Sequence, residues 1–177
     1  MRALLVYESI YGNTAAIGEA IAASLRDRGV EVESAPVSKI GPELAAEADL
    51  LVVGGPTHVH GMSSARSRKT AVDDEKNMYE EPTLAPGLRE WIEELSPGDG
   101  RLAAAFDTRI DKPIVLTGSA AKGIAKRLER RGFRLALKPE CFLVSTGNAL
   151  LEGEFHHAAT WGIELAEAAS AIAPGNR

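Results

Sequence analysis

A six-residue segment near the N-terminus carries side chains that could bind an anion. Ser9 and Thr14 offer hydroxyls, Asn13 offers an amide, and Gly12 allows a tight turn. An apolar run typical of a buried strand ends at Tyr7, and a helical pattern begins at about Thr14. The first N–H groups of a helix lack partners and carry about half a positive charge, so a phosphate placed there needs no lysine. The segment consists of Ser9, Ile10, Tyr11, Gly12, Asn13 and Thr14.

The same segment admits a simpler interpretation. Thr14 or Asn13 could cap the helix by accepting hydrogen bonds from its first turn, while Gly12 serves the turn alone. Taken by itself, the segment favours neither interpretation.

Two further segments follow apolar strands and carry polar or planar side chains. We predict that both line the same crevice as the N-terminal segment. The alternatives are an ordinary strand exit and an exposed Asp107–Arg109 ion pair worth at most ~1 kcal/mol. The two histidines of the first segment have no third metal ligand near them in the sequence, so we expect no metal. The candidates are Pro56, Thr57, His58, Val59, His60 and Gly61 in the first segment, and Phe106, Asp107, Thr108 and Arg109 in the second.

Apolar runs alternate with helical periodicity along most of the chain. Strands are predicted at residues 3–7, 30–37, 49–55 and 102–106, and a fifth lies within 133–145. We expect this fifth strand to break near Pro139, because proline cannot donate a hydrogen bond to a neighbouring strand. Helices are predicted at residues 14–29, 42–48, 84–95, 120–131 and 158–172. Residues 61–82 show no clear period.

This order of elements predicts one α/β domain over residues 1–177. Its strands would form a doubly wound, five-stranded parallel sheet with helices on both faces. Ligands of such sheets bind beyond the carboxyl ends of the strands, where the strand order reverses. The loops after the first, third and fourth strands therefore converge on one crevice. A phosphate site beside a cleft with few charges suits a mononucleotide that has a flat ring.

The composition limits the partners and the compartment. A net charge of −5 argues against nucleic acid as the main partner. No apolar run approaches the ~18 residues that a membrane helix requires, and we expect no signal peptide. Cys141 is the only cysteine, which excludes an internal disulfide and a zinc site built on several cysteines. We therefore expect a cytoplasmic protein that does not associate with membranes. The oligomeric state stays open.

The anion-binding segment resembles the phosphate loop of the flavodoxin-like family, which has the form Thr/Ser-x-Thr-Gly-x-Thr. Here the residues are Ser9-Ile10-Tyr11-Gly12-Asn13-Thr14, and the resemblance extends over nearly the whole chain. It implies a sheet order of 2-1-3-4-5 with FMN as the cofactor. It also implies that residues 9–14 hold the phosphate of FMN, and that residues 56–61 and 106–109 hold its isoalloxazine ring.

Several residues depart from the usual pattern of this family. Tyr11 stands where a threonine is common, and residues 56–62 contain no tryptophan or tyrosine to stack on the ring. Phe106 is then the aromatic residue expected beside the ring. Arg109 would place a cation near it and raise its reduction potential. Residues 61–82 exceed a minimal crossover, and they could form a lid, a partner surface or a solvated charged loop.

The sequence lacks the signature motifs of other phosphate-binding folds. No Gly-x-Gly-x-x-Gly follows a strand, and no phosphate loop contains Gly-Lys-Ser/Thr. Gly54 and Gly55 occupy the place of the aspartate that a receiver domain needs. A cysteine phosphatase needs arginine at position 147, where Gly147 stands, so we interpret Cys141 as a small core residue.

Three functions remain from the sequence. The favoured one is an FMN-binding flavodoxin that carries electrons between partner proteins. The second is an FMN-dependent reductase that uses NAD(P)H and a small quinone-like acceptor. Its support is a Gly55-Pro56-Thr57 and Gly61-Met62 pattern similar to that of quinone reductases related to the tryptophan-repressor-binding protein. The third is a flavin-free interaction module. In each case no side chain is assigned as acid, base or nucleophile, because the flavin would supply the redox chemistry.

Overall fold

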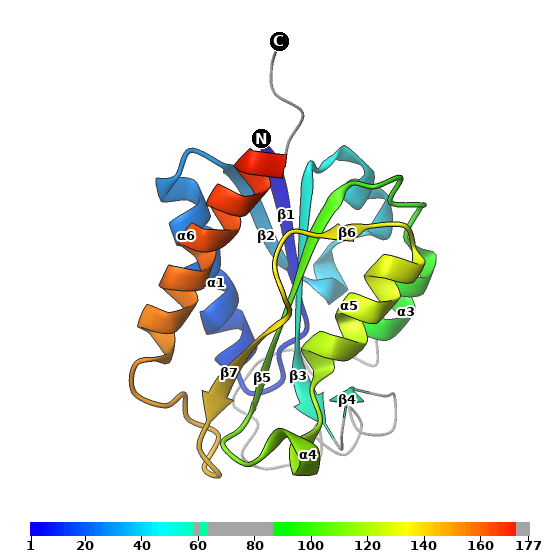
Figure 1. Ribbon diagram of the computed structural model, residues 1–177. Helices are drawn as coiled ribbons and strands as arrows, with labels where there is room; N and C mark the ends of the chain where they lie inside the picture. Colours follow the sequence, from blue (N-terminus) through cyan, green and yellow to red (C-terminus); the bar gives the residue numbers. More distant parts are fainter. Residues whose placement is uncertain (59–60, 64–86, 173–177) are drawn as a thin grey trace.

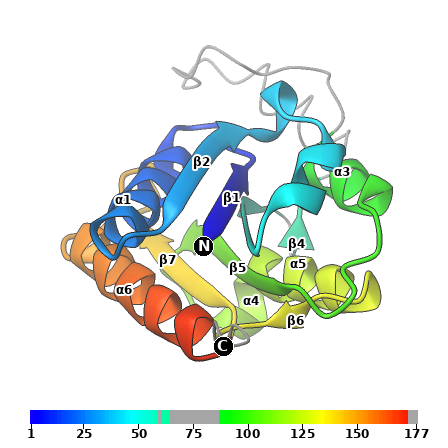
Figure 2. The same cartoon turned by 90° about the horizontal axis from the view of Figure 1, so that it is seen from above.

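In the computed structural model, which describes residues 1–58, 61–63 and 87–172, the chain forms an α/β sandwich (Figure 1). The strands are β1 (Arg2–Tyr7), β2 (Glu31–Pro36), β3 (Leu50–His58), β4 (Gly61–Met62), β5 (Leu102–Ile110), β6 (Arg134–Leu135) and β7 (Glu140–Val144). The helices are α1 (Asn13–Asp27), α3 (Leu88–Glu94), α4 (Ile114–Thr117), α5 (Ala120–Arg130) and α6 (Glu154–Ile172), and two short 3-10 helices are η1 (Val37–Lys39) and η2 (Pro42–Glu47). The sheet separates α1 and α6 from α3 and α5 (Figures 1 and 2).

The sheet confirms the predicted doubly wound topology. Its strand order is β2-β1-β3-β5-β6, and β7 also pairs with β5. These pairings are parallel, and only the short β4 runs antiparallel to β3 among the described strands. Both β6 and β7 lie on the β5 edge and are separated by residues 136–139. The fifth strand is therefore broken next to Pro139, as predicted.

Alternating side chains of the central strands fill a core on each face of the sheet. In β1, Leu5 and Tyr7 face the core beneath α1 and α6, whereas Leu4 and Val6 face the core beneath α3 and α5. Burial on both faces explains why these strands are continuous apolar runs. The register pairs Leu5 of β1 with Val52 of β3, so apolar side chains continue across the sheet.

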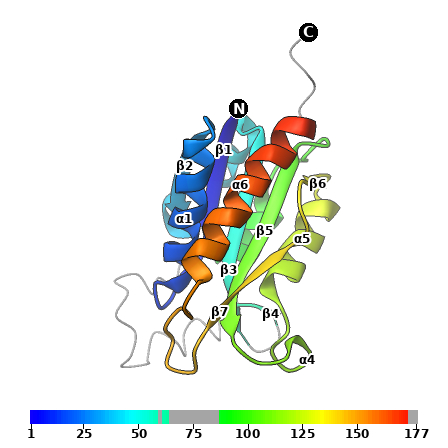
Figure 3. The same cartoon turned by 60° about the vertical axis from the view of Figure 1, so that its left-hand side comes forward.

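The two helices on the first face pack closely along their lengths, as Figure 3 shows. The predicted stripe of α1, made of Ile17, Ile21 and Leu25, is fully buried. On α6, a Cβ atom at Gly162 would lie 2.8 Å from the Cβ atom of Ser24. Glycine at position 162 thus permits this close approach.

Several boundaries differ from those predicted. β5 continues to Ile110 instead of ending at Phe106, because its last five residues pair with β7. α6 begins at Glu154, four residues before the predicted stripe. The segment at 42–48 is a 3-10 helix, and α4 follows Pro113 without having been predicted. The predicted start of a helix at residue 84, and most of 61–82, lie outside the described residues. None of the described helices combines the length and the hydrophobicity that spanning a bilayer requires.

Gly54 is required by the ring of Phe106. A Cβ atom at position 54 would overlap this ring, which is completely buried against Phe142 and Trp161. We expect Gly54→Ala to lower the free energy of unfolding by about 1–3 kcal/mol through overpacking. Urea denaturation measures this loss.

Two further variants test the cause of that loss. Combining Gly54→Ala with Phe106→Leu should cost less than the sum of the single changes, since the smaller side chain relieves the overlap. Gly147→Ala is the matched control, because its new Cβ atom would have its nearest neighbour at 3.6 Å. Wild-type stability in Gly54→Ala would contradict the proposed overlap.

Candidate functional site

A cavity of about 230 Å³ opens at the carboxyl ends of the parallel strands. We call it the edge cavity. It lies where the loop before α1 meets the ends of β3, β5 and β7, so segments far apart in the sequence share one wall. Its lining residues are Ile10, Tyr11, Asn13, Thr14, Pro56, Thr57, His58, Thr108, Arg109, Ile110, Val144 and Asn148.

The start of α1 leaves main-chain donors beside the edge cavity. Gly12 precedes the helix with a φ of 85°, a left-handed conformation that glycine adopts without strain. No described residue accepts a hydrogen bond from the main-chain N–H groups of Gly12, Asn13 or Thr14. The hydroxyl of Ser9 accepts from the N–H of Ala15 at 3.2 Å. These free N–H groups at a helix N-terminus suit an anion.

Two buried hydroxyls connect α1 with β5 at the wall of the edge cavity. The Oγ1 atoms of Thr14 and Thr108 lie 2.7 Å apart, and these residues are 2% and 5% exposed. Each hydroxyl has one hydrogen, and their mutual bond uses only one of the two. The pair therefore keeps one donor for a ligand. The Asn13 side chain already has a partner, because its Nδ2 donates a hydrogen bond to the carbonyl oxygen of Asn148 at 2.8 Å.

His58 lines the edge cavity at the end of β3. Burial lowers the pKa of its imidazole below the ordinary 6.5, and the carboxylate of Glu8 opposes this shift by Coulombic attraction. The imidazole is therefore neutral at pH 7. Its Nε2 atom is buried and has no hydrogen-bond partner among the described residues.

Arg109 contributes a fixed cation to the same wall. Its Nη1 donates to the carbonyl oxygens of Lys112 at 2.7 Å and Ile110 at 3.3 Å, which folds the side chain over the turn after β5. Its Nε atom is buried and has no hydrogen-bond partner in the part of the chain that the structure describes. No carboxylate in the described ranges forms an ion pair with it. The positive charge thus stays available to the edge cavity.

Two predicted site residues of β5 lie away from the edge cavity. Phe106 is fully buried in the core beneath α1 and α6. The Oδ2 atom of Asp107, which is also fully buried, accepts from Ser119 Oγ at 2.7 Å, the N–H of Ala121 at 2.8 Å and Thr57 Oγ1 at 3.0 Å. Because β5 extends to Ile110, the part of this strand that lines the edge cavity begins at Thr108 and not at Phe106.

The other predicted residues divide into four groups. Four of the six residues of the first loop line the edge cavity, and Ser9 and Gly12 shape the start of the helix. Pro56 and Thr57 line it as well, although Thr57 uses its hydroxyl to donate to Asp107 and to accept from the N–H of Ala120. Gly61 lies in β4, where it pairs with His58 of β3. Val59 and His60 lie outside the described residues.

Three lining residues were not predicted: Ile110, Val144 and Asn148. The first two follow from the extended pairing of β5 with β7. Asn148 has a φ of 61° in the turn after β7. The sequence could have indicated Asn148, because the Gly147-Asn148 pair is typical of a turn, and a turn at the end of the fifth strand reaches the same edge of the sheet.

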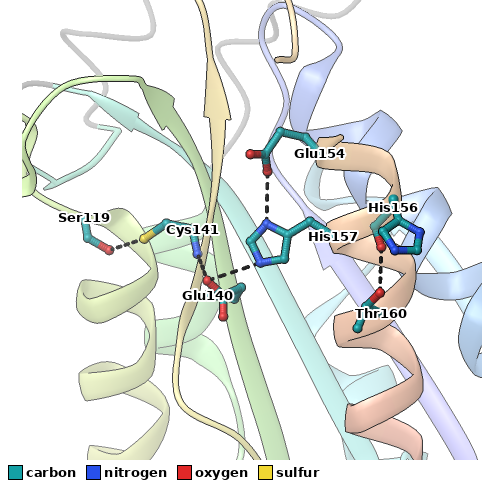
Figure 4. A network of polar contacts seen from close by, with 7 residues as sticks. All are labelled: Ser119, Glu140, Cys141, Glu154, His156, His157 and Thr160. Atoms are coloured by element: carbon teal, nitrogen blue, oxygen red, sulfur yellow. Dashed lines mark hydrogen bonds and ion pairs between the residues drawn. The ribbon is translucent and has the colours of Figure 1, made fainter. Parts of the chain in front are cut away.

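Cys141 lies behind the site on β7, in the cluster of Figure 4. Its Sγ atom is 3.5 Å from Ser119 Oγ, and burial together with the charge of Asp107 raises the pKa of the thiol. Cys141 is therefore a protonated thiol at pH 7 and a poor nucleophile.

The same view shows His157 joining α6 to β7. Its Nδ1 lies 3.2 Å from Glu154, and its Nε2 lies 3.7 Å from Glu140. The two carboxylates contact opposite ring nitrogens, so they do not converge on a point that one metal ion could occupy together with the imidazole.

Comparison with known proteins relates this chain to flavodoxins, both by sequence and by structure. A family model described as flavodoxin matches residues 5–101, which is more than half of the chain. An archaeal flavodoxin structure superposes with a TM-score of 0.67 at 21% identity, covering 96% of this chain and 99% of that one. Oxidised flavodoxin 2 from Bacillus cereus gives 0.68 at 20% identity, with 94% and 99% covered. A WrbA-like flavodoxin from Agrobacterium tumefaciens gives 0.60 at 16%, with 96% and 98% covered. No curated protein matches the chain by sequence.

Proposed function

Because the chain belongs to the flavodoxin family, we propose that it binds FMN in the edge cavity and carries electrons between partner proteins. The observation that carries this proposal is the composition of the cavity wall. N–H groups at the start of α1 that have no acceptor among the described residues adjoin the Thr14–Thr108 hydroxyl pair, and the planar side chains of Tyr11 and His58 line the same space. The wall thus offers donors for a phosphate and planar side chains for a flat ring.

The residues present fit FMN in charge and in hydrogen-bonding capacity. A phosphate is satisfied by helix N–H groups and hydroxyl donors without a neutralising lysine. Residues 9–14 would hold it, while Pro56, His58, Thr108 and Arg109 would surround the ring. When bound, FMN would supply the electron-accepting ring, and the protein would supply position and electrostatics.

Arg109 favours a second candidate, an FMN-dependent reductase that uses NAD(P)H and a quinone-like acceptor. A cation that no described carboxylate neutralises stabilises negative charge on a reduced ring and therefore raises its potential. A higher potential favours reduction by NAD(P)H. The structural likeness to a WrbA-like flavodoxin shows the fold and does not discriminate between the two candidates.

Titration of the ligand-free protein with FMN and with riboflavin tests the proposal. We expect FMN to bind at micromolar concentration and at least about tenfold more tightly than riboflavin, because hydrogen bonds to a charged group contribute about 1.5–3 kcal/mol. Quenching of flavin fluorescence measures both affinities. Absence of FMN binding would overturn the proposal and favour a flavin-free interaction module.

Stepwise reduction of the FMN complex then separates carrier from reductase. A stable one-electron-reduced spectrum supports the carrier. Oxidation of NADH or NADPH in the presence of a quinone, without such a spectrum, supports the reductase.

A further inference from the structure

A buried carboxylate and a half-buried imidazole lie at the neighbouring ends of β1 and β3. Glu8 continues the ladder of β1, donating its main-chain N–H to the carbonyl oxygen of Gly54 at 3.0 Å. Its side chain is held on the α3 side, where Oε2 accepts from the N–H of Leu88 at 3.0 Å. Glu8 is only 7% exposed, so its charge is poorly screened by water. This charge acts on His58.

His58 combines two properties that no structural role in the described residues explains. It lines the edge cavity, and its Nε2 is a buried polar atom without a partner there. Buried polar atoms in native proteins are almost always satisfied, so such an atom indicates a function or a missing partner. In a cavity wall, a proton bound to the imidazole would interact with whatever charge the cavity holds.

The charged groups around His58 set the balance between its two forms. Glu8 directly follows β1, the loop before α1 contributes Tyr11, and β5 contributes Arg109 at the wall of the same cavity. On α3, Arg89 is engaged through its Nη2 with the carbonyl oxygen of Met62 at 3.3 Å. Burial keeps the imidazole neutral while the cavity holds no added negative charge. The carboxylate of Glu8 lowers the free energy that protonation of the imidazole requires.

We propose that His58 binds a proton when a flavin ring in the edge cavity is reduced, and that Glu8 is a positioning residue whose charge favours this uptake. The inference rests on the proposed FMN site. Electrons come from a partner protein or a small redox mediator and go to the ring. The extra proton comes from solvent and forms an N–H bond at Nε2 of His58. His58 gains one positive charge, which offsets negative charge added to the ring, and no bond joins the two.

The first test uses the ligand-free protein and the imidazole C–H signals in NMR. The His58→Gln variant identifies the His58 signal, because that signal disappears from among those of the four histidines. We expect its titration midpoint below 6.5, and Glu8→Gln should move it lower still, since the attraction that favours the charged form is lost. An identical midpoint in wild type and Glu8→Gln would overturn the role of Glu8.

The second test measures the midpoint potential of the FMN complex by spectroelectrochemistry between about pH 5 and 8. The potential falls as pH rises, and one additional proton per two electrons steepens this slope by about 30 mV per pH unit. We expect the steeper slope in wild type and not in His58→Gln, over the pH range between the His58 pKa values of the oxidised and reduced complexes. Glu8→Gln should move the steep region to lower pH. His156→Gln, an exposed residue of α6, is the matched control and should keep the wild-type slope.

The two proposals fail in different ways. Parallel slopes in wild type and His58→Gln, with FMN bound, would overturn the proton uptake alone. Failure of the wild type to bind FMN would overturn both. If His58→Gln does not fold, the position of the steep region in Glu8→Gln decides the question, and an unchanged position would overturn the inference.

Discussion

Asp107→Ala is expected to lower the free energy of unfolding by about 3–5 kcal/mol. The carboxylate is fully buried and accepts three hydrogen bonds, from Thr57, Ser119 and the N–H of Ala121. Each bond to a charged acceptor contributes about 1.5–3 kcal/mol, and release of the carboxylate from its desolvated site offsets part of that total. The negative charge also lies at the N-terminus of α5, where it stabilises the helix dipole. Urea denaturation measures the loss.

Asp107→Asn separates the hydrogen bonds from the charge. An amide oxygen can accept the same bonds, so this variant should lose only about 1–2 kcal/mol. Asp111→Ala, on the exposed turn after β5, is the control and should stay within about 0.5 kcal/mol of wild type. Equal losses in the asparagine and alanine variants would show that charge dominates. Wild-type stability in Asp107→Ala would contradict the anchoring role.

The sheet could be predicted because each strand carries its own signal. Continuous apolar runs such as residues 50–53 indicate strands buried on both faces, and strand–helix alternation with right-handed crossovers restricts the topology. The break at Pro139 was predictable from the missing N–H donor. The true end of β5 was not, because residues 107–110 are polar or mixed. Residues 107 and 108 pair with both β3 and β7, and residues 109 and 110 pair with β7 alone, which lies about 30 residues further along the chain.

The end of β5 at Ile110 instead of Phe106 explains most of the differences between the predicted site and the observed one. Asp107 and Arg109 look like an exposed pair when the strand ends at Phe106. In the longer strand they point to different surroundings, Asp107 to the start of α5 and Arg109 to the edge cavity. The first loop needed no such long-range information, since Gly12 and the start of α1 are adjacent in sequence. The Glu8–His58 pair depends on β1 and β3 being neighbours, and no local pattern indicates it.

Thr14→Val is expected to weaken FMN binding by about 10- to 100-fold while changing riboflavin affinity by less than about twofold. Valine keeps the shape of threonine and removes the hydroxyl. In the ligand-free protein this hydroxyl is bonded to Thr108, and the pair retains one hydrogen for a ligand. A phosphate at the start of α1 would accept that hydrogen, and riboflavin has no phosphate. Fluorescence quenching with each ligand measures the two affinities.

Two matched variants separate the phosphate contact from the loss of the threonine pair. Thr14→Ser keeps the hydroxyl and should retain near wild-type FMN affinity. Thr108→Val breaks the same 2.7 Å bond from the β5 side, so it should share the stability loss of Thr14→Val, about 1 kcal/mol, while leaving the Thr14 hydroxyl free to contact phosphate. Its preference for FMN over riboflavin should therefore persist. Equal loss of both ligands in Thr14→Val would place the phosphate away from Thr14, because a hydroxyl that serves only the packing of α1 against β5 cannot distinguish the two.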